Sequence, residues 1–410
     1  MRLLIITSAT VCGGAEAYAL TIAKGAAQAG WETHVAFPLA EATAFLREEF
    51  WTHQVFYHPL DISEPNSRGV RAMRDALARF RRTRSLLLAL QPDVVLINLP
   101  WADHCLGSIL ACGQLRLPTA VMFHLLPPEN IPLSRSRRQL YTWARARGQQ
   151  WLTNSEANRR LLNDLFKMPA KDLQVIYNGI QLSPPQDCTP ANRAMLRQAV
   201  RQELGVPDNT RLLLTVGRLA PQKGYTDLLA IVPQLLAKHP DIRFVWAGAG
   251  EQQQELHDRL QKAALDDAVL MLGHRSDLPR LLQAADLFVF PTRFEGHPFA
   301  LLEAMAYGLP IVTTNASSIP EIMQHEVHGL LCDANDSHAL LHAIDWALQH
   351  SEPMQTMAVH AAQRVKTFSQ THMVEKTLNV FYTLAVSMQQ ERQRERIAEV
   401  SDRVMEKCDS

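Results

Sequence analysis

Short apolar runs alternate with longer amphipathic segments along the whole chain, and this pattern predicts a succession of strands and helices. Near the beginning, residues 3–6 are expected to form a strand, residues 15–29 a helix and residues 33–37 a second strand. Further strands are predicted at residues 93–97, 119–123, 212–216, 242–247, 269–272, 285–290, 311–315 and 329–332. Regular alternation of strand and helix is typical of parallel sheets, so the predicted fold class is α/β.

The length of the chain indicates more than one domain. Its 410 residues exceed what one ordinary domain holds, so two domains are expected. The boundary is predicted in the polar, proline-rich segment 182–190. This gives a first domain of residues 1–182 and a second of residues 183–374. Helical periodicity continues over residues 354–388, and the highly charged residues 389–410 are predicted to form an exposed helix or a frayed end.

Composition excludes several classes of protein. The 41 Lys and Arg residues equal the 41 Asp and Glu residues, so nothing indicates binding to nucleic acid. The cysteines have no metal-site spacing and are expected to be reduced thiols of a cytoplasmic protein: Cys12, Cys105, Cys112, Cys188, Cys332 and Cys408. The first apolar run is too short for a secretory signal, and no run approaches the roughly 18 apolar residues of a membrane span.

One combination of strand, loop and helix carries two acidic residues. The strand at 285–290 is followed by a loop with Glu295 and Gly296, and then by an alanine-rich helix at 299–307 that contains Glu303. The first amides of a helix lack partners inside it and favour a negative ligand such as phosphate. Those amides belong to Phe299, Ala300 and Leu301. The two carboxylates would hold hydroxyl groups beside that phosphate; the alternative is that both are ordinary solvated surface acids.

Two cations follow the first strand of the second domain. Arg218 and Lys223 flank the loop after the strand at 212–216, where their charge and hydrogen bonding suit a diphosphate. Taken singly, each could be an ordinary surface cation. A second glycine-containing loop, with Gly248 and Gly250, follows the next strand.

The first domain contributes a glycine pair and a histidine. Gly13 and Gly14 follow the first strand, where a backbone can approach a ligand closely; a plain tight turn is the alternative. No G-x-G-x-x-G motif is present, which argues against a dinucleotide-dependent oxidoreductase. His124 stands at the carboxyl end of the strand at 119–123, where α/β sheets bind ligands, although a lone histidine is often structural.

A basic helix is predicted at residues 134–150. It mixes several arginines with Tyr141 and Trp143, a combination that can lie on an anionic membrane surface. The alternative is an ordinary solvated helix face.

Three motifs carry a resemblance to a known family. Glu295 and Glu303 have the spacing of an E-x7-E motif, residues 216–224 have the form V-G-R-x4-K-G, and residues 175–179 have the form V-I-x-N-G. These motifs, and their order along the chain, resemble those of retaining nucleotide-sugar glycosyltransferases with the GT-B fold, and glycosyltransferase family 4 in particular. The chain departs from the family pattern at Leu125 and Gln181, where an acidic residue is usual, and at residues 317–318, where two serines replace glycines.

The resemblance implies two Rossmann-like domains facing across a cleft, with final helices (residues 375–410) crossing back to the first domain. The second domain would bind the nucleotide sugar and the first would bind a glycan or glycolipid acceptor. Arg218 and Lys223 would bind the diphosphate, Glu303 the ribose, and Glu295 and His124 the transferred sugar. Gly248 and Gly250 would belong to the donor site and lie near the nucleotide base. No cofactor or metal ion is expected.

The implied activity is transfer of a hexose with retention of configuration, in polysaccharide or glycolipid synthesis, by a cytoplasmic enzyme whose peripheral contact with a membrane is left open. A catalytically inactive partner subunit that only binds nucleotide sugars is the alternative. The donor, the acceptor and the oligomeric state are not predicted.

Overall fold

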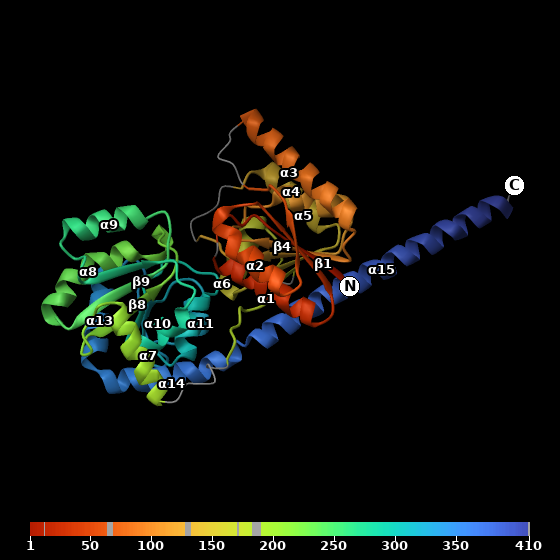
Figure 1. Cartoon of the computed structure of the whole chain (residues 1–410). Helices are drawn as coiled ribbons and strands as arrows, with labels where there is room; N and C mark the ends of the chain where they lie inside the picture. The colour runs from red at the N-terminus through yellow and green to blue at the C-terminus, as the bar shows by residue number, and fades with distance from the viewer. Residues whose placement is uncertain (12, 64–68, 128–132, 170–171, 183–189, 409–410) are drawn as a thin grey trace. The chain divides into compact units, whose positions relative to one another are not determined.

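The chain folds as two units, each built on a parallel sheet (Figure 1). The computed structural model describes residues 1–11, 13–63, 69–127, 133–169, 172–182 and 190–408. One unit comprises Met1–Ile176 and His372–Ser410, and the other comprises Tyr177–Thr371. The predicted linker lies mostly outside the described residues, and the passage between the units falls a few residues before it, after Ile176.

The first unit alternates strand and helix from its first residue. Its elements are β1 (Arg2–Thr7), α1 (Gly14–Gln28), β2 (Glu32–Phe37), α2 (Ala44–Thr52), β3 (Phe56–Pro59), α3 (Gly69–Leu90), β4 (Val94–Leu99), α4 (Leu106–Gln114), β5 (Thr119–Phe123), α5 (Arg135–Arg145), β6 (Gln149–Thr153), α6 (Glu156–Phe166) and β7 (Leu173–Val175). A short 3-10 turn, η1 (Glu41–Thr43), precedes α2. The strands lie in the order β3-β2-β1-β4-β5-β6-β7, and every pair is parallel.

The second unit repeats the plan with a smaller sheet. Its elements are α7 (Pro190–Glu203), β8 (Arg211–Val216), α8 (Tyr225–Lys238), β9 (Ile242–Ala247), α9 (Gln253–Lys262), β10 (Val269–Gly273), α10 (Leu278–Ala284), β11 (Leu287–Phe290), α11 (Phe299–Ala306), β12 (Ile311–Thr314), α12 (Ile319–Ile322), β13 (Leu330–Cys332), α13 (Ser337–Gln349) and α14 (Ser351–Arg364). Two 3-10 turns, η3 (Pro221–Lys223) and η4 (Val365–Thr367), complete it. The strand order is β10-β9-β8-β11-β12-β13.

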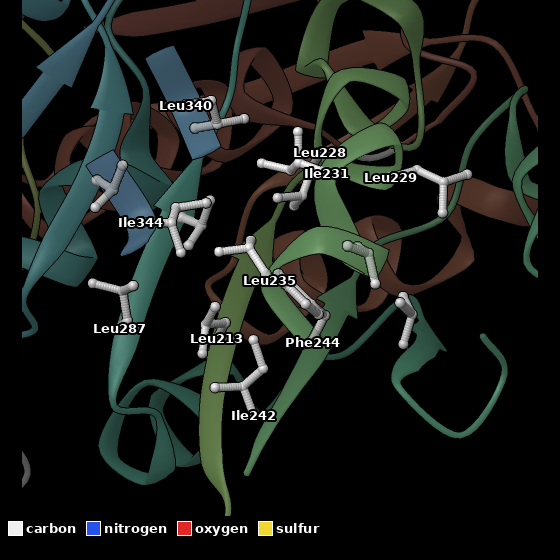
Figure 2. Close-up of a cluster of buried hydrophobic side chains, with 14 of the residues drawn as sticks. Leu213, Leu228, Leu229, Ile231, Leu235, Ile242, Phe244, Leu287, Leu340 and Ile344 are labelled. Carbon is white, nitrogen blue, oxygen red and sulfur yellow. The ribbon is translucent and has the colours of Figure 1, made fainter. Parts of the chain in front are cut away.

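Alternating side chains of β8 fill two apolar layers, one on each face of the second sheet. Leu213 packs in one layer with residues of α8 and α13, among them Leu235 and Ile344 (Figure 2). Leu212 and Leu214 point to the opposite layer, formed with α7, α10 and α11. Because successive strand residues face opposite sides, a continuous apolar run such as Leu212–Leu214 requires helices on both faces.

The helical periodicity over residues 354–388 corresponds to two helices rather than to one. α14 ends at Arg364, and α15 (Gln370–Cys408) begins only after η4 and Phe368. The break was not predicted, because residue 369 pairs with Ile180 in a parallel bridge, a tertiary contact that helical periodicity cannot show. In the first unit, α15 contacts α1, where the Tyr18 hydroxyl lies 3.1 Å from Thr377 Oγ1.

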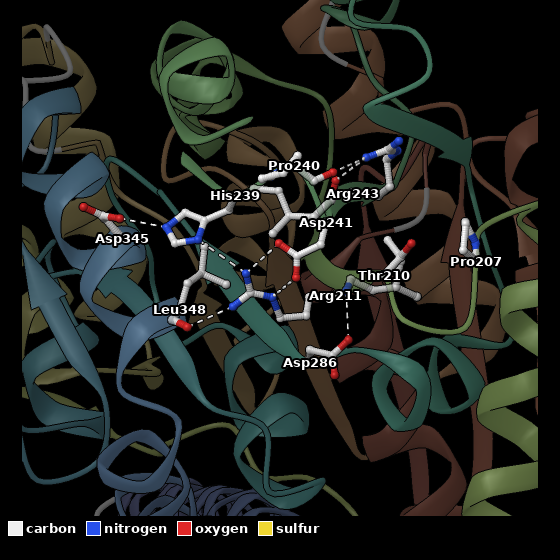
Figure 3. Close-up of polar contacts among 12 residues, drawn as sticks. Pro207, Thr210, Arg211, His239, Pro240, Asp241, Arg243, Asp286, Asp345 and Leu348 are labelled. Carbon is white, nitrogen blue, oxygen red and sulfur yellow. Dashed lines mark hydrogen bonds and ion pairs between the residues drawn. The ribbon is translucent and has the colours of Figure 1, made fainter. Parts of the chain in front are cut away.

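A polar network joins the ends of α8 and α13 in the second unit (Figure 3). Arg211 donates to both carboxylate oxygens of Asp241, each at 2.8 Å. Asp345 accepts from Lys238 Nζ at 2.6 Å and pairs with His239 Nε2 at 2.8 Å. The hydrogen bond from Lys238, and to a smaller extent the one with His239, lowers the pKa of Asp345 to about 2.

We expect Asp345→Asn to lower the melting temperature at pH 7 but not near pH 2. The folded-state pKa of Asp345 lies below the ordinary aspartate value of 3.8, so its stabilisation is present above about pH 4 and is lost as the pH falls toward 2. Thermal melts of both proteins across this pH range measure the effect. Asp258→Asn, which changes an exposed acid of α9, is the control and should change little at either pH. An equal loss at pH 7 and pH 2 would contradict the electrostatic explanation.

Candidate active site

The second sheet has one point where its strand order reverses, and most of the predicted donor residues lie there. The chain builds outward from β8 to β9 and β10 and then returns to place β11 on the other side of β8. The loops after β8 and β11 therefore leave the carboxyl edge of the sheet side by side. Ligands of open α/β sheets bind at such a reversal point.

Lys223 and Glu295 meet across this point. Lys223 Nζ donates to Glu295 Oε1 at 2.5 Å, and Thr292 Oγ1 donates to the same oxygen at 2.8 Å. The two charged side chains are only 16% and 6% exposed. Lys223 Nζ also lies 5.1 Å from the centroid of the Phe290 ring. A largely buried, hydrogen-bonded ion pair at the edge of the sheet holds both groups in one geometry.

Neighbouring residues fix the two loops to each other. Gln222 is buried; its side chain donates to Phe294 O at 2.8 Å, and its own carbonyl accepts from Arg293 N at 2.8 Å. Arg293 in turn donates to both oxygens of Asp227 at the start of α8. The loops carrying Lys223 and Glu295 are thus tied together by several bonds, so the ion pair lies on a rigid support.

Arg218 lies apart from this pair. Its Nη1 is 3.7 Å from Glu251 Oε2, and its side chain is 37% exposed. Gly248 and Gly250 support the loop that carries Arg218. A Cβ on Gly248, whose φ is +155°, would lie 1.9 Å from Gly217 O, and one on Gly250 would lie 2.4 Å from Leu219 O. These glycines let the two loops touch along their backbones.

The first turn of α11 lies next to Glu295 in the chain. Pro298 is the residue before the helix, and it makes no side-chain capping bond. The amides of Phe299, Ala300 and Leu301 therefore have no acceptor within the helix and no cap from Pro298. Glu303 lies one turn later; its side chain is partly covered, and burial raises the pKa of its carboxyl group.

In the first unit, His124 is held by a buried asparagine at the corresponding reversal point, between β1 and β4. Asn98 donates through Nδ2 to Ala15 O at 3.0 Å, so its Oδ1 accepts from His124 Nε2 at 2.6 Å. This assigns the proton to Nε2. Burial lowers the pKa of His124 to about 3, so the ring is neutral at pH 7. The Tyr18 ring packs edge-on against it, with centroids 4.8 Å apart.

The glycine pair lies at the same edge. Gly14 is the first residue of α1 and Gly13 precedes it. A Cβ on Gly13 would lie 3.3 Å from Glu16 Oε2, so this buried carboxylate folds back over the start of its own helix. The Ser8 hydroxyl, just after β1, lies 3.0 Å from His104 Nδ1.

Solved structures share this architecture. The structure of Anabaena HepE in complex with UDP-glucose superposes with a TM-score of 0.76 at 21% identity, over 93% of this chain and 100% of that chain. That of WaaG, a glycosyltransferase of lipopolysaccharide biosynthesis, superposes with a TM-score of 0.73 at 16% identity, over 93% and 99% of the two chains. Both share the predicted GT-B fold.

Family models match each half of the sequence. The model of the glycosyl transferases group 1 matches residues 197–364, and that of Glycosyltransferase Family 4 matches residues 12–183. The chain belongs to the GT-B glycosyltransferases. A relative of this glycosyltransferase is the E. coli UDP-Gal:alpha-D-GlcNAc-diphosphoundecaprenol alpha-1,3-galactosyltransferase, 32% identical over 47% of this chain and 49% of that protein. The chain thus spans about half the length of this relative, and 61% of that of an uncharacterized glycosyltransferase from Methanocaldococcus jannaschii.

The structure brings together some of the predicted residues of this glycosyltransferase and separates others. Lys223 and Glu295, predicted for different parts of the donor, are in direct contact, whereas Arg218 pairs with Glu251. Ser317, which replaces a family glycine, has a φ of +48° and so keeps a left-handed backbone.

Two supporting residues were not predicted. Asn98 and Thr292 are both completely buried, and each bonds a predicted site residue. A signal for Asn98 was available, since it is the one amide side chain in the otherwise apolar run of β4.

Proposed function

We propose that this chain transfers a sugar from a nucleoside-diphosphate sugar to a hydroxyl group of a glycan or glycolipid acceptor, with retention of configuration. The observation that carries the proposal is the Lys223–Glu295 pair at the reversal point of the second sheet, directly before the first turn of α11. A cation, a carboxylate and a set of helix amides thus occur together where such sheets bind ligands.

Each residue has a role in the proposal. Negative charge develops on the departing diphosphate, and Lys223, Arg218 and the first amides of α11 would stabilise it. Glu295 would accept hydrogen bonds from sugar hydroxyls, and Glu303 from the ribose. The cationic side chains and helix amides supply positive charge themselves, which supports a reaction without a metal ion. His124, neutral at pH 7, would contact the sugar through its ring rather than as an acid.

A thermal-shift screen against UDP-, GDP- and ADP-sugars, with and without EDTA, tests the donor part. A ligand that binds the folded protein raises its melting temperature. One nucleotide class should stabilise the protein equally with and without EDTA. A shift that EDTA removes would contradict metal independence, and no shift with any donor would contradict the nucleotide-sugar assignment. NMR of the anomeric proton in the product then tests retention.

The acceptor is proposed to be membrane-associated, which one face of α5 supports. Leu140 and Trp143 are 42% and 36% exposed and lie three residues apart on this face, and the Arg147 guanidinium covers the Trp143 ring at 3.9 Å. Apolar side chains beside arginines suit an anionic lipid surface. The named acceptor of the E. coli relative is lipid-linked, which also supports the proposal. No described helix is long and apolar enough to cross a membrane.

We expect Trp143→Ser to release the protein from anionic vesicles. Flotation with phosphatidylglycerol vesicles should recover the wild-type protein in the lipid fraction and leave most of the variant behind, because the aromatic anchor of α5 is gone. Trp346→Ser, which changes a tryptophan of α13 with a similar exposure of 37%, is the matched control and should float like the wild type. A wild-type protein that stays unbound would rule out this surface.

A further inference from the structure

The chain passes between its two units twice, and the residues next to these passages pair with each other in the second unit. It enters that unit at Tyr177 and leaves it after Thr371. Ile180 N donates to Phe368 O at 3.0 Å, and Gln370 N donates to Ile180 O at 2.8 Å. A Cβ on Gly179 would lie 2.2 Å from Ser369 O, so the two backbones touch and exclude a side chain there.

The loop between β11 and α11 joins the same pairing. Asn178 Nδ2 donates to His297 O at 2.7 Å. The His297 ring packs against Tyr177 and Phe368, with a centroid distance of 5.0 Å to each. The cluster of Tyr177, His297 and Phe368, here called the aromatic clasp, therefore takes one ring from the entering segment, one from the leaving segment and one from the loop.

His297 contributes to this clasp by packing and by its backbone. Its side chain is 2% exposed, and neither ring nitrogen has a hydrogen-bond partner among the described residues. Burial, with a smaller effect of the nearby Arg364 charge, lowers its pKa to about 3, so the ring is neutral at pH 7. Asn178 is 3% exposed, and its bond to the His297 carbonyl is therefore shielded from water.

We propose that Asn178 and His297 are positioning residues that couple the donor loop, residues 295–301, to both passages of the chain between its units. This proposal rests on the proposed function of that loop. His297 lies two residues after Glu295 and two before Phe299, and a proline follows it. A shift of the loop on binding a diphosphate must therefore move the His297 carbonyl and ring, and with them the segments at Ile180 and Gln370.

Amide hydrogen exchange of the full chain tests the coupling, with UDP, GDP and ADP as probes. In the wild-type protein, the nucleotide that binds should slow exchange at the donor loop and also at the amides of Ile180 and Gln370. Asn178→Ala should retain protection of the loop and lose it at the two passage amides. Its KM for the donor should rise about tenfold, the size of effect expected for losing one shielded hydrogen bond, while kcat changes less.

Two further variants separate positioning from a purely structural role. His297→Phe keeps the ring packing and the carbonyl, so it should behave like the wild type in exchange and in KM. Asn315→Ala changes an exposed asparagine that donates to Asp333, and it should have no effect on either readout.

The wild-type exchange measurement alone is decisive, even if Asn178→Ala does not fold. Protection of the donor loop without protection at Ile180 and Gln370 would overturn the coupling and leave the proposed function standing. Absence of protection with all three nucleotides would instead overturn the proposed function, and the coupling with it.

Discussion

Replacing Lys223 with alanine is expected to reduce kcat for sugar transfer by about 100- to 1,000-fold, the range found when one preorganised charge-stabilising group is removed from an active site. Lys223 is the most buried cation of the candidate site and lies directly against Glu295. Water is largely excluded around Lys223, so its attraction to the negative charge that develops on the diphosphate would be stronger than at an exposed position. Steady-state kinetics with the donor identified by the thermal-shift screen measures the loss. A Lys223→Ala variant with wild-type kcat would contradict the assignment of Lys223 to the phosphate site.

The control for this experiment addresses stability. Removing Lys223 leaves the buried Glu295 carboxylate without its cation, which is costly in itself. The double variant Lys223→Met with Glu295→Gln removes both charges, so it should regain the melting temperature lost in the single variant. Its kcat should stay low, because the cation and the carboxylate that would contact the sugar are both missing. Recovery of activity together with stability would show that Lys223 acts only as a partner for Glu295.

Much of the fold follows from local pattern. The strand at 119–123 and the start of the helix at residue 299 were placed at the residues where the structure has them, because apolar runs of strand length and helix-forming composition are local signals. The break between α14 and α15 was not predicted. After the 3-10 turn at residues 365–367, Phe368 and residue 369 pair with Ile180, and this partner lies far away in the sequence.

The same distinction holds for the candidate site. The motifs place Lys223 and Glu295 at the ends of their strands, but they do not show that the two side chains share an ion pair. That contact depends on β8 and β11 becoming neighbours, which is a property of the strand order. Asn178 likewise belongs to the V-I-x-N-G motif, yet its bond to the His297 carbonyl spans 119 residues of sequence. Local pattern predicts which residues reach the edge of the sheet, and topology decides which of them touch.

Glu303→Ala is expected to weaken binding of the nucleoside diphosphate by about 10- to 100-fold, because a charged hydrogen bond to the ribose contributes about 1.5–3 kcal/mol. KM for the donor should rise while kcat changes little, since this contact is made equally before and during transfer. Isothermal titration calorimetry with UDP, GDP and ADP measures the affinity directly. Glu255→Ala, which removes an exposed glutamate of α9, is the control and should bind as the wild type does.

The pH dependence of the same titration sharpens the test of Glu303. Burial raises the pKa of this carboxyl group above the ordinary glutamate value of 4.5, and only the ionised form accepts two ribose hydrogen bonds. Affinity should therefore fall as the pH decreases through the raised pKa, beginning at a higher pH than for an ordinary glutamate. Glu303→Gln cannot ionise, so it should bind weakly with no such step. A wild-type affinity that stays constant as the pH falls through that range would show that another residue binds the ribose. A glutamine variant that retains the fall in affinity would show the same. The proposed phosphate site at Lys223 and α11 would be unaffected by that result, because the Lys223 variants test it independently.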